Sequence, residues 1–320
     1  MEDRSLEDEL YYFDDEDDDE LDLFKLVSTD SNDLNQYLVF QGSNDEWYAM
    51  NVSKIEEVIV FDEKMEISHN NDETNIIFAT ADIRNSMTPL IYFDRWYGNR
   101  QLEDEEYELI ILANYGGHKL GIIVKKVFAI CIIEAENMSD NSQNNLKSTF
   151  ISKVIIEGES QLCSIYDGDK MLLDVFDTTI QRENYHFEES AVEKVKDKVL
   201  FFADDSRFVR SIVEALFKRL GVEYKIFNDG LFLTEYLDSH PQEGVDLFIT
   251  DLEMPKMGGR EVIVNIKNRL YYKETPVLVH TNMSNNAMES ELLEAGAVSI
   301  IGKINMQNLG DAILEKLGNT

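Results

Sequence analysis

The sequence predicts two domains of different fold class, an all-β domain over residues 36–180 and a doubly wound α/β domain over residues 197–320. In the first domain, short apolar runs are broken by Gly, Asn and Asp, which is typical of barrels built from β-hairpins. In the second, apolar runs of strand length alternate with segments of helical periodicity, which indicates a parallel sheet covered on both faces. An acidic segment, residues 1–35, is expected to precede these domains, and a polar linker, residues 181–196, to join them.

The charge of the chain excludes two classes of partner. With 63 Asp and Glu against 29 Lys and Arg, the 320 residues carry a formal net charge of −34, which repels phosphate backbones and anionic lipid. We therefore expect no nucleic-acid partner and no membrane insertion, since no apolar run approaches the ~20 residues that span a bilayer and no signal-peptide pattern is present. Cys131 and Cys163 lie in apolar runs without a CxxC motif, which predicts reduced core residues and a cytoplasmic protein.

Residues 1–35 hold 15 acidic residues against Arg4 and Lys25. Charge repulsion at this density opposes collapse, so we expect a flexible acidic tail. Aromatic and aliphatic residues are interspersed in it, which leaves open a second role as a weak docking peptide.

The all-β prediction depends on the apolar runs and on the turns between them, at GSND, NYGGH, IEGES and YDGD. A short helical turn is expected in DRWYGN after Phe93, and the last apolar run, which ends in KMLLDV, is expected to be a strand. His69 and His118 have no partner at metal-ligand spacing, and neither a GxSxG motif nor a Cys/His pair is present. We therefore expect no enzyme in this half of the chain.

The α/β prediction depends on a pattern that recurs to the end of the chain. The run KVLFFADD ends in acidic residues and is followed by SRFVRSIVEALFKRLG, whose apolar residues keep helical spacing up to Gly221. Similar pairs of strand and helix follow, and together they predict five strands and five helices.

Polar residues follow four of these strands, at the sheet edge where doubly wound proteins place their chemistry. They are Asp204, Asp205, Asp251, Thr281 and Lys303. Neighbouring carboxylates repel one another, and a hard divalent cation with oxygen ligands, Mg²⁺, relieves that repulsion. Such a site suits transfer of a phosphoryl group to a carboxylate oxygen, with the lysine and the threonine contacting other phosphoryl oxygens. Any one of these residues alone is more often a helix cap or turn residue, so the prediction depends on the whole set.

The segment resembles a response-regulator receiver domain over essentially all of residues 197–320. The matching pieces are LFFADDS, FITDLEMPKMGG, VLVHTN and AGAVSIIGK. The resemblance implies that Asp251 is the phospho-acceptor and that Thr281 and Lys303 assist it. It also implies a set of Mg²⁺ ligands: Asp205 and Asp251 directly, Asp204 through water, and the backbone carbonyl of Glu253.

Two positions depart from the usual receiver pattern. Ile304 follows Lys303 where the family usually has proline, and Ile300 stands where an aromatic switch residue is usual. We therefore expect phosphorylation to change the loops after the fourth and fifth strands rather than the outer face near Ile300.

The first half, from about Gln36 to Phe176, resembles the CheW-like coupling domain, which implies two SH3-like barrels packed around a shared core. Arg84 and Pro89 keep the family's separation, and Asn85 stands where glycine is usual. The matching stretches are EWYAMNVSKIEEVIVF, ADIRNSMTPLIYFDRWYG, NYGGHKLGIIVKKVFAICII and FISKVIIEGESQLCSIYDGDKMLLDV. A CheW-like domain fused to a receiver is the arrangement of CheV-type chemotaxis proteins.

This resemblance implies a signalling adaptor rather than an enzyme. Through exposed apolar edges of the barrels it would couple the cytoplasmic domain of chemoreceptors to the chemotaxis histidine kinase. Asp251 would accept phosphoryl groups from that kinase, either to modulate coupling or to act as a phosphate sink. Two alternatives stay open: a pseudo-receiver scaffold that works without phosphorylation, and an enzyme in the first half that the receiver regulates.

Overall fold

The computed structural model describes residues 11–12, 35–62, 65–70, 75–115, 118–141, 147–176, 186–282, 286–303 and 306–318. The chain divides into two compact units, Met1–Met171 and Leu172–Thr320, and each is described by itself. Within the described residues, no helix is both long enough and apolar enough to cross a membrane.

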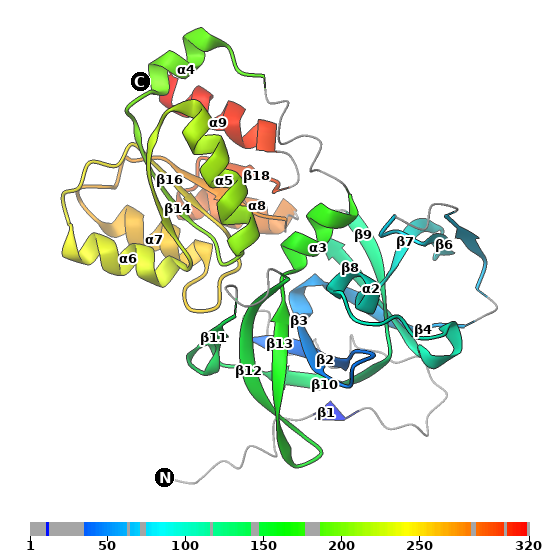
Figure 1. Ribbon diagram of the computed structural model, residues 1–320. Coiled ribbons are helices and arrows are strands. Elements are labelled where there is room, and N and C mark those ends of the chain that lie inside the picture. Colours follow the sequence, from blue (N-terminus) through cyan, green and yellow to red (C-terminus); the bar gives the residue numbers. More distant parts are fainter. Residues whose placement is uncertain are drawn as a thin grey trace, which may run out of the picture. The chain divides into compact units, whose positions relative to one another are not determined.

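The described part of the first unit is built on two β-sheets (Figure 1). The strands of the larger sheet are β1 (Tyr11–Tyr12), β2 (Gln36–Gln41), β3 (Trp47–Asn51), β10 (Lys126–Ile132), β11 (Ser139–Asp140), β12 (Ser148–Ile156) and β13 (Glu159–Tyr166). Those of the smaller sheet are β4 (Ile55–Val60), β5 (Ile67–His69), β6 (Ala79–Ile83), β7 (Ser86–Tyr92), β8 (Leu109–Tyr115) and β9 (His118–Val124). Their orders are β1-β10-β2-β3-β13-β12-β11 and β4-β8-β9-β7-β6-β5. Neighbours are antiparallel except β3 with β13 and β7 with β9.

A tight two-residue turn joins β6 to β7, at a place where no turn is predicted from the sequence. Between β6 and β7 the two turn residues, Arg84 and Asn85, both have positive φ, 50° and 63°. Two consecutive left-handed residues give the turn whose twist matches a hairpin, and asparagine tolerates that conformation better than most residues. The loop therefore forms with asparagine in place of the usual glycine.

Each sheet has its own hydrophobic cluster. Cys131 and Cys163 are both free and buried, and they lie in the cluster of the larger sheet together with residues such as Val39 and Ile165. The prediction that both cysteines are core residues is confirmed. The cluster of the smaller sheet includes Leu90 and Ile110.

One element of the first half differs from the prediction. The expected short helix is present as α2 (Phe93–Tyr97), but the prediction of a strand for KMLLDV is wrong, because these residues lie in α3 (Gly168–Val175). The Asp167 carboxylate accepts a hydrogen bond from the Lys170 amide at 2.9 Å, which starts the helix as a cap does. The apolar residues that follow have helical spacing as well, so a run this short is ambiguous from its pattern alone.

The second unit contains a five-stranded parallel sheet within its described residues, with the order β15-β14-β16-β17-β18. The strands are β14 (Val199–Ala203), β15 (Glu223–Phe227), β16 (Leu247–Thr250), β17 (Val277–His280) and β18 (Ser299–Ile301). The helices are α4 (Glu189–Val195), α5 (Arg207–Leu220), α6 (Gly230–Ser239), α7 (Gly259–Asn268), α8 (Asn286–Ala295) and α9 (Met306–Gly318).

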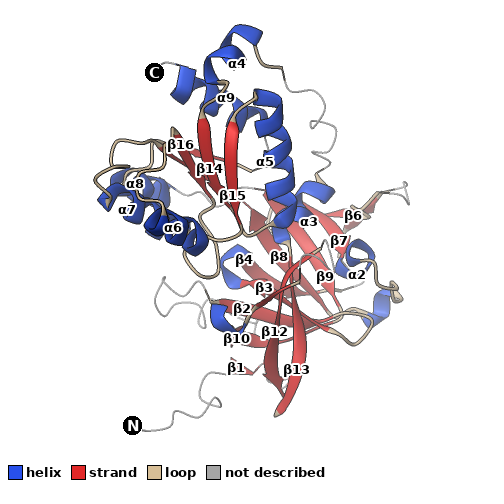
Figure 2. Cartoon of the chain, turned by 60° about the vertical axis from the view of Figure 1, so that its left-hand side comes forward, coloured by secondary structure: helices blue, strands red, loops and turns tan. Residues whose placement is uncertain are grey.

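Helices cover both faces of this sheet (Figures 1 and 2). Phe202 of β14 lies in one cluster with residues of α5 and α9. Its neighbour Phe201 lies in a second cluster with residues of α6, α7 and α8. Because successive residues of a strand point to opposite faces, each strand is apolar on both sides. The predicted doubly wound fold is confirmed.

Two segments expected to be irregular contain secondary structure. Helix α4 lies within the expected linker, residues 181–196, and its last residue, Val195, is completely buried in the cluster with α5 and α9. Strand β1 lies within the expected tail and pairs with β10 through Tyr11 and Ile130. The rest of that tail up to residue 34, and residues 177–185, lie outside the described residues.

Candidate functional site

The carboxyl ends of the parallel strands are aligned by their backbone hydrogen bonds. The amide of Asp251, just after β16, donates to the carbonyl of Ala203 at the end of β14, at 2.8 Å. The amide of Thr281, just after β17, donates to the carbonyl of Ile301 at the end of β18, at 2.9 Å. The residues that follow four strands therefore lie along one edge of the sheet.

At this edge one lysine bridges two aspartates. Lys303 Nζ lies 2.9 Å from Oδ2 of Asp251 and 3.1 Å from Oδ2 of Asp204. All three side chains are at most 4% exposed. Carboxylate oxygens of Asp204 and Asp251 lie within 4.8 Å of one another. Two buried carboxylates so close together require a cation, and the lysine neutralises only one of the two negative charges.

The backbone holds the other oxygen of each aspartate. Oδ1 of Asp204 accepts a hydrogen bond from the amide of Ser206 at 2.9 Å, and Oδ1 of Asp251 accepts one from the amide of Leu252 at 2.6 Å. Ser206 in turn caps α5, because its hydroxyl accepts from the amide of Val209 at 3.2 Å. The two Oδ2 atoms are therefore oriented toward Lys303.

The remaining predicted residues lie in the same strand-end segments. Asp205 is half-buried and directly follows Asp204, Glu253 is half-buried in the loop after Asp251, and Thr281 is buried at the end of β17. The predicted ligands would contribute carboxylate oxygens and one carbonyl oxygen, and these are the ligands that Mg²⁺ prefers. The residues present therefore fit a magnesium site formed by Asp204, Asp205, Asp251 and Glu253.

Close packing fixes the loop after Asp251. A Cβ on Gly259, the first residue of α7, would lie 2.1 Å from the carbonyl oxygen of Asp251, so only glycine fits. The Gly259 amide also donates to the carbonyl of Leu252 at 2.8 Å. The loop therefore returns to within contact of the residue that it follows.

Comparisons with known proteins agree with this architecture. Residues 36–176 match the family described as CheW-like domain, and residues 200–314 match the response regulator receiver domain. The chain is 27% identical over 307 residues to chemotaxis protein CheV1 of Helicobacter pylori, covering 89% of this chain and 94% of that protein. It is 24% identical over 313 residues to CheV2 of the same organism, covering 92% and 99%.

This chain has the CheV-type architecture. Among solved structures, scaffolding protein TtCheW from Thermoanaerobacter tengcongensis is 17% identical, with a TM-score of 0.36, and the match covers 42% of this chain and 88% of that one. The two family matches confirm the predicted order of a CheW-like β domain followed by a receiver domain.

The CheW-like domain of this CheV-type chain has a hollow of about 280 Å³ on its smaller sheet. Its apolar lining comes from Ile83, Leu112, Ala113 and Leu120, and the rest of the lining is Thr88 and four charged residues. Two ion pairs lie there, Arg84 with Glu57 at 2.5 Å and Lys119 with Glu56 at 2.8 Å. Burial by itself raises the pKa of Glu56, but hydrogen bonds from Lys119 and Asn114 outweigh it and hold this pKa below its ordinary value.

Two residues of the CheV-type receiver site are absent from the sequence-based set. Asn282 is buried, and its Oδ1 accepts a hydrogen bond from the amide of Lys303 at 3.1 Å, which ties the ends of β17 and β18 together. Arg210 donates from its guanidinium to the carbonyl of Asp204 at 2.7 Å. Asn282 directly follows the threonine in VLVHTN, and this position next to a predicted site residue is the sequence feature that could have identified it. Arg210 belongs to a helix with ordinary helical spacing and gives no such signal.

Proposed function

We propose that this CheV-type protein is a chemotaxis adaptor of the cytoplasm. Its CheW-like domain couples chemoreceptors to the chemotaxis histidine kinase, and its receiver domain accepts a phosphoryl group on Asp251. The observation that supports the second part most strongly is the placement of Asp251: its carboxylate lies at the sheet edge, held by the Leu252 amide and paired with the Lys303 ammonium.

The proposed transfer follows from this geometry. A carboxylate oxygen of Asp251 attacks the phosphorus of a phosphohistidine, the new O–P bond forms as the N–P bond breaks, and the histidine nitrogen leaves and takes up a proton. Lys303 pairs with a phosphoryl oxygen, and the Thr281 hydroxyl donates a hydrogen bond to another. Asp205, Asp251 and the Glu253 carbonyl would hold Mg²⁺ directly and Asp204 would hold it through water, and the bound ion would supply positive charge to neutralise the incoming phosphoryl group.

For coupling, we propose that the partner contacts the hollow of the smaller sheet and the apolar residues exposed on that sheet. Val60 and Met87 are 64% and 66% exposed, whereas solvated strand faces usually carry polar residues. An apolar lining with charged residues around it fits a protein partner.

The receiver half of the proposal is tested by phosphoryl transfer. The full-length chain is incubated with ³²P-labelled chemotaxis kinase and Mg²⁺, and label on the chain is followed by gel. Asp251→Asn keeps the size of the side chain but removes the nucleophile, so we expect no transfer. The matched control is Asp246→Asn, at the opposite end of the same strand, which should be labelled at the wild-type rate. Wild-type chain that stays unlabelled while it still binds the kinase would indicate a scaffold that works without phosphorylation.

The coupling half is tested by sedimentation with receptor–kinase arrays. Met87→Lys places a charge on the proposed contact surface and should weaken co-sedimentation. The control is Leu162→Lys, the same kind of change at a leucine that is 60% exposed on the larger sheet. Equal effects of both changes would show that the partner does not bind specifically at the smaller sheet. Turnover of ester or phosphate substrates by the CheW-like domain would favour an enzyme instead.

A further inference from the structure

The loop between Asp251 and α7 is held by a buried carboxylate from another part of the receiver domain. Asp229 follows β15 and is 2% exposed. Its Oδ1 accepts hydrogen bonds from the amide of Leu231 at 2.9 Å, which caps α6, and from the amide of Met257 at 3.1 Å. Its Oδ2 accepts one from the amide of Lys256 at 2.9 Å. One side chain thus joins the start of α6 to the loop after the acceptor aspartate.

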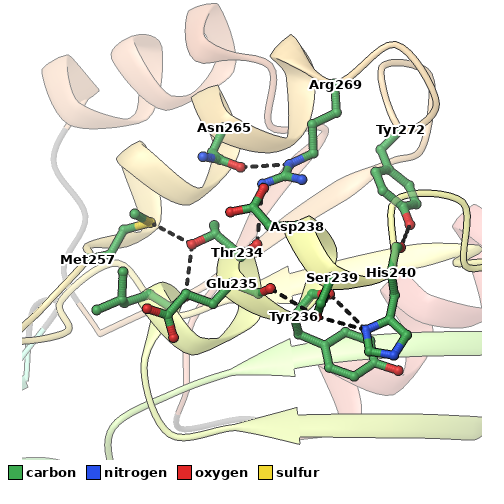
Figure 3. A network of polar contacts seen from close by, with 11 residues as sticks. Thr234, Glu235, Tyr236, Asp238, Ser239, His240, Met257, Asn265, Arg269 and Tyr272 are labelled. Carbon is green, nitrogen blue, oxygen red and sulfur yellow. Dashed lines mark hydrogen bonds and ion pairs between the residues drawn. The ribbon is translucent and has the colours of Figure 1, made fainter.

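The first turns of α6 hold the same two loop residues in further ways. A Cβ on Gly230 would lie 2.4 Å from the carbonyl oxygen of Met257, so helix and loop are in direct backbone contact. Figure 3 shows the side chain of Met257 beside Thr234, whose hydroxyl lies 3.5 Å from the sulfur. The ammonium of Lys256 lies 4.7 Å from the centre of the Phe232 ring. Lys256 and Met257 are therefore fixed to α6 by backbone and side chain.

Helix α6 is in turn fixed to the far end of α7. Arg269 donates to the Thr234 carbonyl at 3.2 Å and to the Asp238 carboxylate at 2.7 Å, and its Nε donates to Asn265 at 2.8 Å (Figure 3). The loop is therefore held at two places. Gly259 packs against Asp251, and α6 holds Lys256 and Met257, so the residues from Leu252 to Pro255 have little conformational freedom. Glu253 is one of these residues.

We propose that Asp229 is a positioning residue for the metal site of the receiver, acting through the loop that carries the Glu253 carbonyl. The inference rests on the proposed function, since it takes Glu253 as a metal ligand. Burial raises the pKa of Asp229 above its ordinary value, although three backbone hydrogen bonds lower it. Both oxygens of the Asp229 carboxylate accept hydrogen bonds from the three backbone amides. An asparagine would turn its amide nitrogen toward at least one of these N–H groups and could not accept all three hydrogen bonds.

The test uses the full-length chain, first with Mg²⁺ alone and then with Mg²⁺ and acetyl phosphate. The thermal midpoint of the receiver is measured against Mg²⁺ concentration for wild type and for Asp229→Asn. Loss of a group that orients a metal ligand weakens metal binding by about tenfold or more, so the half-saturating Mg²⁺ concentration should rise by at least that factor. Phosphorylation by acetyl phosphate should recover to within about twofold of wild type once Mg²⁺ is saturating, since only metal binding is affected.

Two further variants separate positioning from stability. Gly230→Ala keeps the carboxylate but displaces the Met257 carbonyl, and it should raise the half-saturating concentration in the same direction. Asp246→Asn removes a carboxylate that accepts from Val199 and Lys198 at the other end of the sheet; it should lower the midpoint and leave the Mg²⁺ requirement unchanged. If Asp229→Asn and Gly230→Ala lower the midpoint without changing the Mg²⁺ requirement, the role of Asp229 is only structural. If the thermal midpoint of the wild type does not change with Mg²⁺ concentration, the metal site itself is wrong, and this inference is wrong with it.

Discussion

Lys303 places its ammonium 2.9 Å from Oδ2 of Asp251, and both side chains are buried. The same ammonium reaches Asp204, so a single cation compensates two carboxylates that would otherwise repel each other in the interior. Breaking such a pair leaves an uncompensated buried charge.

Replacing this lysine should therefore be strongly destabilising when Mg²⁺ is absent. For Lys303→Met we expect the free energy of unfolding of the receiver, measured by urea titration in EDTA, to fall by about 3–5 kcal/mol. Millimolar Mg²⁺ should restore part of the loss, because the metal takes over the compensating charge. Lys316→Met is the control: its partner Glu315 is 65% exposed, and a change of less than about 0.5 kcal/mol is expected. Similar losses in both variants would contradict a compensating role for Lys303.

Mg²⁺ should stabilise the wild-type receiver by mass action. At a Mg²⁺ concentration ten times the dissociation constant, the expected gain is about 1.4 kcal/mol, which differential scanning calorimetry detects as a raised midpoint. Asp205→Ala removes a proposed direct ligand and should abolish the rise. Asp311→Ala changes an exposed carboxylate on α9 and should keep it. A rise that survives in Asp205→Ala would remove this residue from the ligand set.

Phosphorylation should change the loops after β17 and β18 more than the outer face of the sheet. A phosphoryl group on Asp251 offers Thr281 a charge-assisted hydrogen bond and Lys303 an ion pair, and Asn282 links the two loops. Ile300 has no hydroxyl or aromatic ring that could move inward in response to this change. Hydrogen exchange of the full chain with and without beryllofluoride should show protection at Asn282 and Met306 and little change at Ile300. The neighbouring residues 283–285 and 304–305 lie outside the described residues. Identical exchange in both states would make the receiver a phosphate sink rather than a switch.

The CheW-like domain contains a buried carboxylate whose loss should destabilise it. Asp94 is fully buried, and it accepts hydrogen bonds from the Ser43 amide at 3.0 Å, the Asn99 side chain at 2.9 Å and the Tyr107 hydroxyl at 3.2 Å. Asp94→Ala removes the shared acceptor of three donors, of which the Tyr107 hydroxyl is buried and the other two are partly buried, and should lower the free energy of unfolding by about 3 kcal/mol or more. Asp94→Asn keeps one oxygen and should lose less. If both variants lose the same free energy of unfolding in urea titrations, the hydrogen bonds that Asp94 accepts do not account for its contribution to stability.

Both cysteines should resist thiol reagents in the native protein. Burial raises the pKa of Cys131 to about 11, and it also raises the pKa of Cys163. At pH 8 the thiolate fraction of Cys131 is then about one in a thousand. We expect almost no reaction with Ellman's reagent in native buffer and two equivalents in guanidinium chloride. Rapid native labelling of either cysteine would contradict its place in the core.

The sequence by itself determined both fold classes and the receiver site. Alternation of apolar runs with helical segments specifies a parallel sheet covered on both faces, and residues that follow its strands must meet at one edge. Asp251, Thr281 and Lys303 could therefore be found without coordinates.

Only the tertiary structure decided what depends on contacts between distant segments. The apolar run of α3 fits a strand or a helix, and the cap at Asp167 decided between them. Helix α4 is mostly exposed and polar, and it is fixed by the burial of Val195 in a core whose other members come from elsewhere in the chain. Asp229 has the sequence pattern of an ordinary helix cap. Its hydrogen bonds to Lys256 and Met257 arise because the parallel sheet brings the ends of β15 and β16 to one edge, where residues 27 and 28 positions apart in the chain meet.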